Sequence, residues 1–221
     1  MMLLVQQDGK NILIDTGVPP AAAGDPGGLS RAFDLDPAWI KPLVGPHERV
    51  DAQLELLGLR TSELDMVVNT HLHFDHAGGN PLLRDVPLWV QDAELESVAD
   101  SEDPAFWDGP FVTFRNVRGD WSPVSGVDML LTPGHTPGHQ SVLIHSPGQD
   151  WLFTWDAVYT EEHWREDKLG AVVDVTAARS SLRRLRRLAE RPNTRCVFGH
   201  DLAQWTALGL TGPEPVVLID S

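Results

Sequence analysis

Short runs of apolar residues, each closed by a turn-forming residue, recur along most of the chain. Runs of this kind, rich in Val, Ile and Leu, predict buried strands. We therefore expect strands in NILIDTG (11–17), MVVNT (66–70), VPLWVQ (86–91), VDMLLTPG (127–134), HQSVLIHSP (139–147), DWLFTWD (150–156) and TRCVFGHD (194–201).

Apolar residues at helical spacing predict helices between some of these strands. In HERVDAQLELLGL, the residues Val50, Leu54 and Leu57 follow that spacing before Gly58 ends the pattern. The segment 92–100 predicts a short helix, and the segment 176–191 predicts an amphipathic helix with leucines on one side and arginines on the other. Strands come first and helices then interleave with strands, which favours mixed sheets covered by helices.

Two long stretches show no periodicity. They run from Val18 to Pro46 and from Ser101 to Pro123. Loops of this length are usually functional or disordered. Both carry aromatic residues that are candidates for an apolar substrate groove, with core packing as the alternative for each: Phe33, Trp39, Phe106, Trp107 and Phe111.

Composition limits the class of protein. The 221 residues are 42% hydrophobic, which is enough for one sizeable core, so we expect one domain over residues 1–221. We find no apolar stretch that could span a membrane and no secretory signal at the start, so we expect a cytoplasmic protein. Cys196 is the only cysteine, which excludes an internal disulfide and a thiolate metal cluster. We interpret it as a small buried hydrophobe.

The charge balance is strongly acidic. The net charge is −15, from 32 acidic and 17 basic residues. A nucleic-acid partner is disfavoured, because phosphate contacts need a basic face. The arginines of the helix expected at 176–191 then indicate a solvated outer face rather than a membrane or nucleic-acid surface. A neutral or cationic small substrate stays compatible with the charge.

Three histidines and one aspartate fall within six residues in NTHLHFDHAGGN. A strand delivers the chain to this H-x-H-x-D-H pattern, and AGGN turns it away. In an extended stretch His71, His73 and Asp75 share one face. A turn beginning near Phe74 would let Asp75 and His76 diverge toward a second centre. Imidazole and carboxylate suit zinc and similar divalent ions, so this segment predicts a metal site.

Further ligands must come from elsewhere in the chain. His135, Asp156 and His200 each stand where a predicted strand passes into a loop, which is where sites form in layered folds. We interpret His139 as a residue that supports the turn or a ligand. The three remaining histidines have no comparable context, and we expect them at the surface: His47, His145 and His163.

The seven candidate ligands, in chain order, resemble the metal ligands of the metallo-β-lactamase fold superfamily: His71, His73, Asp75, His76, His135, Asp156 and His200. The likeness runs from about Val5 to Asp201. The resemblance implies an α/β (α+β) fold, a four-layer αββα sandwich of two mixed sheets flanked by helices. It also implies two divalent metal ions, with zinc preferred and iron, manganese or cobalt as alternatives. Carried over by motif, the first ion is held by His71, His73 and His135, the second by Asp75, His76 and His200, and Asp156 bridges them.

Asp15, in NILIDTG, resembles an aspartate of the family that orients a metal ligand; a turn-capping role is the alternative. Four sequence segments are similar to the corresponding segments of the N-acyl homoserine lactonases: HLHFDHAGGN, TPGHTPGHQSVLI, DAVY and FGHD. That resemblance implies opening of the lactone ring, known as quorum quenching, by a metal-bridging hydroxide. Tyr159 would then contact the substrate carbonyl, and Asp75 would donate a proton to the leaving oxygen.

Two alternatives stay open. The first is hydrolysis of another ester, thioester or lactone, as in glyoxalase II-like enzymes, although those carry a helical domain and only about 20 residues follow His200 here. The second is an inactive metal-binding protein, because the chain starts almost at the family's second strand and we expect the usual first strand to be missing. Trp155, before Asp156, also departs from the smaller residues of relatives. Relatives dimerise, so a homodimer is a further expectation that no feature of the sequence decides.

Overall fold

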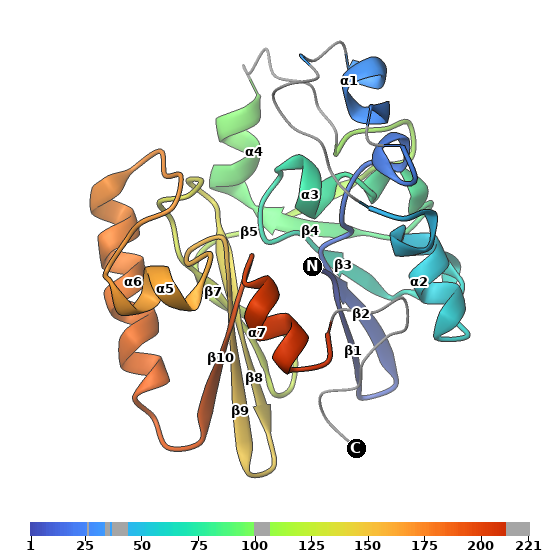
Figure 1. Cartoon of the computed structure of the whole chain (residues 1–221). Coiled ribbons are helices and arrows are strands. Elements are labelled where there is room, and N and C mark those ends of the chain that lie inside the picture. The colour runs from blue at the N-terminus through green and yellow to red at the C-terminus, as the bar shows by residue number, and fades with distance from the viewer. Residues whose placement is uncertain (26, 34–35, 37–43, 100–106, 211–221) are drawn as a thin grey trace. The chain divides into compact units, whose positions relative to one another are not determined.

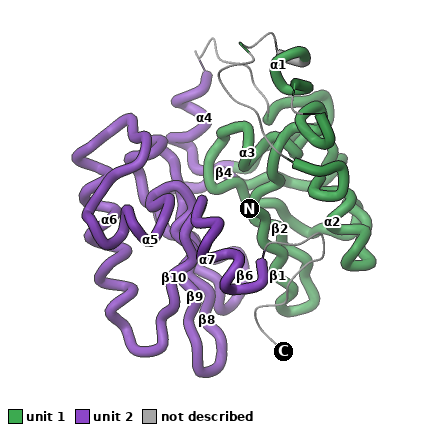
Figure 2. Tube along the Cα trace, in the orientation of Figure 1, with its two compact units in different colours: residues 1–89, 101–115, 213–215 green, residues 90–100, 116–212, 216–221 purple. Residues whose placement is uncertain are grey.

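We describe the protein from a computed structural model, which describes residues 1–25, 27–33, 36, 44–99 and 107–210. The chain divides into two compact units (Figure 2). Among the described residues, the first unit contains 1–89 and 107–115, and the second contains 90–99 and 116–210. The expectation of one domain over the whole chain stays a prediction.

The first sheet has five strands in the order β1-β2-β3-β4-β5. β1 pairs antiparallel with β2, whereas β2–β3 and β3–β4 are parallel, so the sheet is mixed. β1 is an edge strand that starts two residues into the chain. The strands are β1 (Leu3–Gln7), β2 (Lys10–Ile14), β3 (Met66–Val68), β4 (Leu88–Gln91) and β5 (Phe114–Val117).

Helix α2 (Val50–Leu56) covers one part of the first unit's core (Figure 1). Its Val50 and Leu54 are buried against Leu13 and Val67 of the strands. Each such side chain contributes about 1.5–3 kcal/mol by leaving water. The other helical elements of this unit are short: η1 (Pro20–Ala22), α1 (Gly28–Phe33), η2 (Pro46–Glu48), η3 (Thr61–Glu63), α3 (Phe74–Ala77) and η4 (Asn80–Leu82).

The second sheet has the order β10-β9-β8-β7-β6. Its strands β6 to β9 pair antiparallel, and β10 is parallel to β9. Helix α6 packs along β9 and β10 (Figure 1), where its Leu182 and Leu185 join the core with Leu152 and Phe198. The elements are β6 (Trp121–Val124), β7 (Val127–Leu131), β8 (Gln140–Ser146), β9 (Gln149–Trp155), β10 (Thr194–Phe198), α4 (Asp92–Val98), α5 (Glu161–Arg165), α6 (Val175–Ala189) and α7 (Leu202–Ala207).

The predicted pattern of two mixed sheets flanked by helices is confirmed, as are the seven predicted strands and three predicted helices. The two long stretches expected to be irregular are not wholly so. The first contains η1, α1 and the first residue of η2, and the second contains β5 and most of β6. β5 was not predicted from the sequence. Its residues, FRNV, have two exposed polar side chains between half-buried ends, so the strand contains no apolar run.

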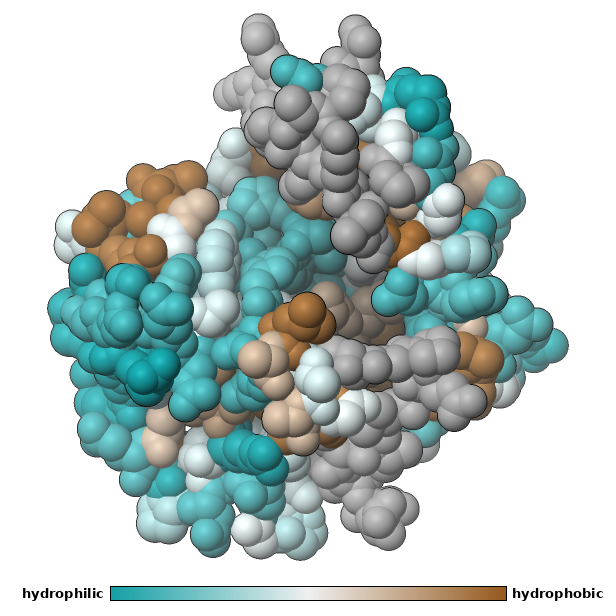
Figure 3. All heavy atoms as spheres, in the orientation of Figure 1, coloured by the Kyte–Doolittle hydropathy of each residue, from teal (hydrophilic) through white to brown (hydrophobic). Residues whose placement is uncertain are grey.

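Hydrophilic residues make up most of the coloured part of the face shown in Figure 3, in line with the net charge of −15. The arginine face of α6 pairs with acidic residues: Arg179 and Arg186 contact Asp167, and Arg184 contacts Asp120. This agrees with a solvated outer face. Across the described ranges, no helix is both long and apolar enough to cross a bilayer.

The single cysteine has an unreactive setting. Cys196 is partly buried and packs against the apolar core of the second unit. This burial raises the pKa of its thiol to about 11, because the thiolate is poorly solvated there. Its interpretation as a small packing residue is consistent with both observations.

Candidate metal centre

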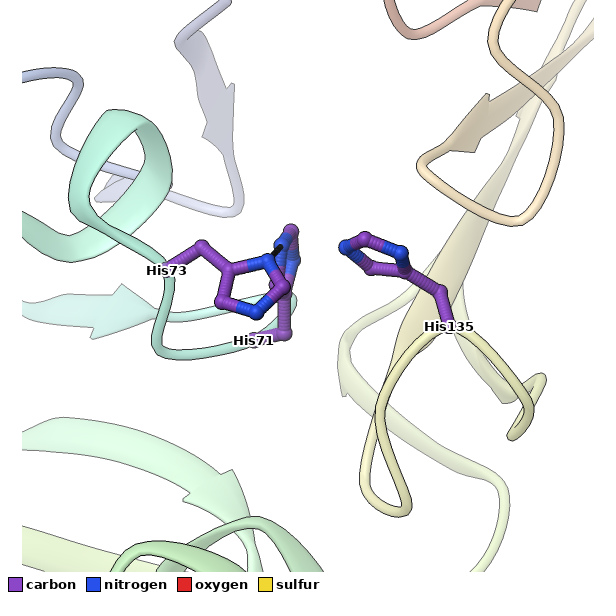
Figure 4. Close-up of side chains that lie close together, drawn as sticks. All are labelled: His71, His73 and His135. Carbon is purple, nitrogen blue, oxygen red and sulfur yellow. Dashed lines mark hydrogen bonds between the residues drawn. The ribbon is translucent and has the colours of Figure 1, made fainter. Parts of the chain in front are cut away.

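The ligand segment of the first unit leaves β3 and enters α3. The predicted turn near Phe74 is confirmed as a one-turn helix that begins at that residue. His71 Nε2 lies 3.0 Å from His73 Nδ1, the contact marked by the dashed line in Figure 4. The rings of His71 and His76 have centroids 4.1 Å apart. His76 Nε2 lies 3.4 Å from Asp75 Oδ2, so all four side chains gather at one end of β3.

Asp15 holds this segment from the end of β2. Its Oδ1 accepts a hydrogen bond from Thr70 N at 2.7 Å, and its Oδ2 accepts one from Thr70 Oγ1, also at 2.7 Å. Oδ2 also lies 2.8 Å from His76 Nδ1. A carboxylate can only accept, so Nδ1 carries the proton and Nε2 presents a lone pair. This geometry suits the predicted orienting role better than the turn-capping alternative.

A buried polar network fixes the backbone around the same segment. Thr16 Oγ1 donates to Asn80 Oδ1 at 2.9 Å, and Asn80 Nδ2 donates to Asn69 Oδ1 at 2.9 Å. All three side chains are almost fully buried. The close approach of Gly79 to Thr16 needs glycine, because a Cβ there would lie 2.3 Å from the Thr16 carbonyl oxygen. Thr16, Asn69, Gly79 and Asn80 were not predicted to support the site, although Asn and Gly residues flanking the histidines in NTHLHFDHAGGN were a usable signal.

The second unit supplies a matching set. His135 follows β7, Asp156 follows β9 and His200 follows β10. His135 Nε2 lies 3.3 Å from Asp156 Oδ2, and His200 Nε2 lies 3.1 Å from Asp156 Oδ1. His135 Nδ1 donates to the carbonyl oxygen of Ala171 at 2.7 Å, which leaves Nε2 as its ligand atom. A backbone carbonyl carries no sequence signal, so Ala171 could not have been found beforehand.

His139 lies beneath Asp156 and is fully buried. Its Nε2 accepts a hydrogen bond from Asp156 N at 3.1 Å, while Nδ1 contacts Thr132 Oγ1 at 2.9 Å. Both ring nitrogens are thus engaged in the supporting role expected for this residue. His47 and His145 are exposed as expected, but the expectation for His163 is wrong: it is half-buried because α5 lays its ring on Tyr159.

Tyr159 is half-buried among the ligands of the second unit. Its hydroxyl lies 3.4 Å from His135 Nδ1, and its ring centroid lies 5.2 Å from that of His200. A phenol at this place can donate a hydrogen bond to a group bound beside the ligands.

The aromatic residues predicted to line a substrate groove differ in their exposure, and some lie outside the described residues. Trp107 is half-buried against Phe114, with ring centroids 5.5 Å apart. Phe111 is 42% exposed beneath the guanidinium of Arg84. Phe33 ends α1, and Trp39 and Phe106 lie outside the described residues. Their role in substrate binding stays a prediction.

The donor set fits divalent metal ions. The seven predicted ligands all belong to groups of side chains that could hold an ion. Two ligands ~2.0–2.1 Å from a tetrahedral ion lie roughly 3.3–3.4 Å apart. The donor atoms within each unit lie 3.0–3.4 Å apart, close to that separation. Imidazole nitrogen and carboxylate oxygen accept zinc, iron, manganese or cobalt.

Known proteins resemble this chain in sequence and fold. The family model of the metallo-beta-lactamase superfamily matches residues 1–200. An N-acyl homoserine lactonase of Bacillus sp. is 36% identical over 204 residues, which is 91% of this chain and 80% of the relative. The lactonase AttM of Rhizobium johnstonii is 32% identical over 223 residues, 92% of this chain and 82% of the relative.

A solved N-acyl homoserine lactone hydrolase, with N-hexanoyl-L-homoserine at its catalytic metal centre, matches with a TM-score of 0.84 and 33% identity. The match covers 93% of this chain and 82% of that one. The likeness confirms the predicted fold. The chain belongs to the metallo-beta-lactamase superfamily, in the branch that contains the N-acyl homoserine lactonases.

Proposed function

We propose that this protein is a dinuclear metal-dependent hydrolase that opens the ring of N-acyl homoserine lactones. The observation that carries the proposal is Tyr159, which lies beside two candidate ligands, His135 and His200, in a chain one-third identical to lactonases. Those relatives are named for this reaction, and one solved relative has a ring-opened product at its metal centre.

The two ligand sets would act together on two ions, for which zinc is our first choice. One candidate ligand of each unit has a defined tautomer: His76 through Asp15 in the first, and His135 through the Ala171 carbonyl in the second. We assign His71, His73 and His135 to one ion, Asp75, His76 and His200 to the other, and Asp156 to both. When bound, such ions lower the pKa of a coordinated water and polarise a carbonyl.

The side chains have separate tasks in the reaction. Water adds across the ester bond, so oxygen bonds to the carbonyl carbon while the bond from that carbon to the ring oxygen breaks. The Tyr159 hydroxyl donates to the carbonyl oxygen as negative charge develops there, which is worth about 3 kcal/mol for one such donor. Asp75, which is partly exposed, takes up the proton that the attacking water loses and gives it to the departing ring oxygen. The product is the N-acyl homoserine.

The experiment combines metal analysis with a pH-indicator assay on short- and long-chain N-acyl homoserine lactones. Ring opening yields a carboxylic acid that releases a proton near neutral pH, so turnover is seen directly. We expect two ions per chain and rapid opening of the lactones, with slow hydrolysis of S-lactoylglutathione and nitrocefin.

Faster hydrolysis of S-lactoylglutathione would favour the thioesterase alternative. Bound metal with no turnover of any substrate would favour the alternative of an inactive metal-binding protein. The number of ions, their identity as zinc, a homodimer and a cytoplasmic location are part of the same proposal, and mass spectrometry of the native protein addresses the first three.

A further inference from the structure

We propose that His163 and Gly170 are positioning residues that clamp the ring of Tyr159 and thereby aim its hydroxyl. The inference rests on the proposed function, because it assigns the clamp a role in the reaction of Tyr159. All three residues belong to the second unit: Tyr159 precedes α5, His163 lies within α5, and Gly170 lies in the loop between α5 and α6.

Gly170 lies directly against the phenol ring. A Cβ at this position would lie 2.7 Å from Tyr159 Cε2, and 2.9 Å from both Cδ2 and Cζ. Real Cβ atoms essentially never come so close to a ring, so any side chain here would displace the tyrosine. Gly170 has no unusual φ, unlike nine other glycines of the described chain. Glycine is therefore needed at this position because of the space that the Tyr159 ring occupies, and not because of the backbone conformation.

His163 stacks on the same ring. The two centroids are 5.8 Å apart and the planes differ by 27°. His163 Nδ1 is buried and has no hydrogen-bond partner among the described residues. The ring therefore contributes through its flat face, a role that another aromatic side chain can fill.

Helix α5 is itself firmly held, so the stack is rigid. Thr160 caps its start by accepting from His163 N at 3.2 Å, and Asp201 accepts from Glu161 N at 2.8 Å. Trp164 docks the helix on the core, with its ring centroid 5.6 Å from that of Phe198. These contacts fix His163 without involving any metal ligand.

The clamp matters because the contact of the phenol with its neighbour is long. His135 Nδ1 donates a hydrogen bond to the carbonyl oxygen of Ala171 at 2.7 Å and lies 3.4 Å from the Tyr159 hydroxyl. This geometry directs the proton of Nδ1 toward Ala171, while packing against His163 and Gly170 sets the position of the ring and of its hydroxyl oxygen. A group held in its reactive direction avoids an entropic cost in the transition state.

Nuclear magnetic resonance tests the clamp without any substrate, because Tyr159 is the only tyrosine of the chain. Ring-labelled tyrosine gives one set of signals. A stacked aromatic face shields the ring protons, so we expect upfield signals in the native protein. They should move toward free tyrosine in His163→Ala and stay upfield in His163→Phe. The exposed His47→Ala is the matched control and should change nothing.

A stability cycle tests Gly170. We expect Gly170→Ala to lower Tm by about 2–8 °C, the usual effect of overpacking in a chain of this size. The loss should vanish when the ring is absent, in Tyr159→Ala. Gly45→Ala, where the nearest atom to a Cβ is a flexible carboxylate at 3.3 Å, is the control.

Kinetics connects the clamp to the reaction. His163→Ala should lower kcat by at most the ~10–100-fold worth of one donor, with KM nearly unchanged. His163→Phe should restore kcat, and His163→Ala should have no further effect in Tyr159→Phe. Unmoved tyrosine signals in both His163→Ala and Gly170→Ala would overturn the clamp. Shifted signals in a protein that opens no lactone would support the clamp and overturn only the proposed substrate.

Discussion

The carboxylate of Asp15 lies 2.8 Å from His76 Nδ1, and both side chains are sealed from solvent. The same oxygen accepts from Thr70 Oγ1, so one buried group fixes both a candidate ligand and the backbone that leads to the ligand segment. Such a carboxylate raises the basicity of the histidine and holds its orientation. The pair is therefore the point where folding and metal binding in the first unit depend on one another.

Asp15→Asn should weaken metal binding by about 10–100-fold and lower the free energy of unfolding by about 1–3 kcal/mol. The Asn side chain has one NH2 group in place of a carboxylate oxygen, and that group cannot accept the hydrogen bonds that Thr70 and His76 donate to Asp15. Asn tolerates the left-handed backbone of Asp15, where φ is 60°, so the substitution adds no strain. Metal content by plasma mass spectrometry and unfolding in urea measure the two effects.

Asp8→Asn is the matched control, because Asp8 is exposed and has a similar φ of 54°. It should leave both quantities unchanged. Normal metal affinity in Asp15→Asn would remove Asp15 from the metal centre and leave it with a folding role alone.

Tyr159→Phe should lower lactone turnover by ~10–100-fold, because the oxyanion loses one hydrogen-bond donor. The metal content should stay unchanged, since the phenyl ring keeps the contacts with Gly170 and His163. Initial rates and metal analysis on the same sample check this. An unchanged rate would exclude Tyr159 from the mechanism.

The sequence predicted the strands well where apolar residues cluster, because burial on both faces leaves a readable run, as in β3 and β9. It missed β1. It also missed the helices α3, α5 and α7, because four to six residues are too few to repeat an apolar position at helical spacing. The candidate ligands could be singled out because three histidines and one aspartate lie within six residues, a spacing that suits metal binding, and the other candidates stand at the ends of strands.

The support of the ligands was less predictable. Ala171 acts through its carbonyl and Gly170 through the absence of a side chain, and neither use leaves a mark in the sequence. His163 was expected at the surface because it does not stand where a predicted strand passes into a loop, but Trp164 packs this helix onto the core. Contacts distant in the sequence decide these positions.

Trp155 is a fully buried residue with a left-handed backbone, φ 45°, just before Asp156. This conformation costs roughly 1–2 kcal/mol for a residue with a Cβ, and nothing for glycine. Both Trp155→Ala and Trp155→Gly should destabilise the protein by about 3–5 kcal/mol through the cavity. The loss of unfolding free energy should be smaller in Trp155→Gly than in Trp155→Ala by about 1 kcal/mol, because only glycine adopts the left-handed backbone without strain. Equal midpoints in urea would show that the left-handed conformation stores no strain.

His145 gives the fold a dependence on pH that is separate from the metal centre. Its Nδ1 lies 3.1 Å from Asp150 Oδ2 and its Nε2 lies 3.1 Å from Asp128 Oδ2, so both contacts are satisfied only by the protonated ring. Burial alone would lower the pKa of His145, but the hydrogen bonds to Asp128 and Asp150 outweigh it and raise the pKa above its ordinary value.

The stabilisation by His145 should be fully present below about pH 6.5, the ordinary pKa of histidine, and should be lost as pH rises through the raised pKa of the folded protein. The effect is modest, because the ring is 40% exposed and solvent screens the pair. We expect the difference in unfolding free energy between the native protein and His145→Gln to shrink as pH rises above about 6.5. Comparison with this variant removes the titration of the metal ligands, which both proteins share. A difference that grows with pH would mean that the aspartates do not hold the proton on His145.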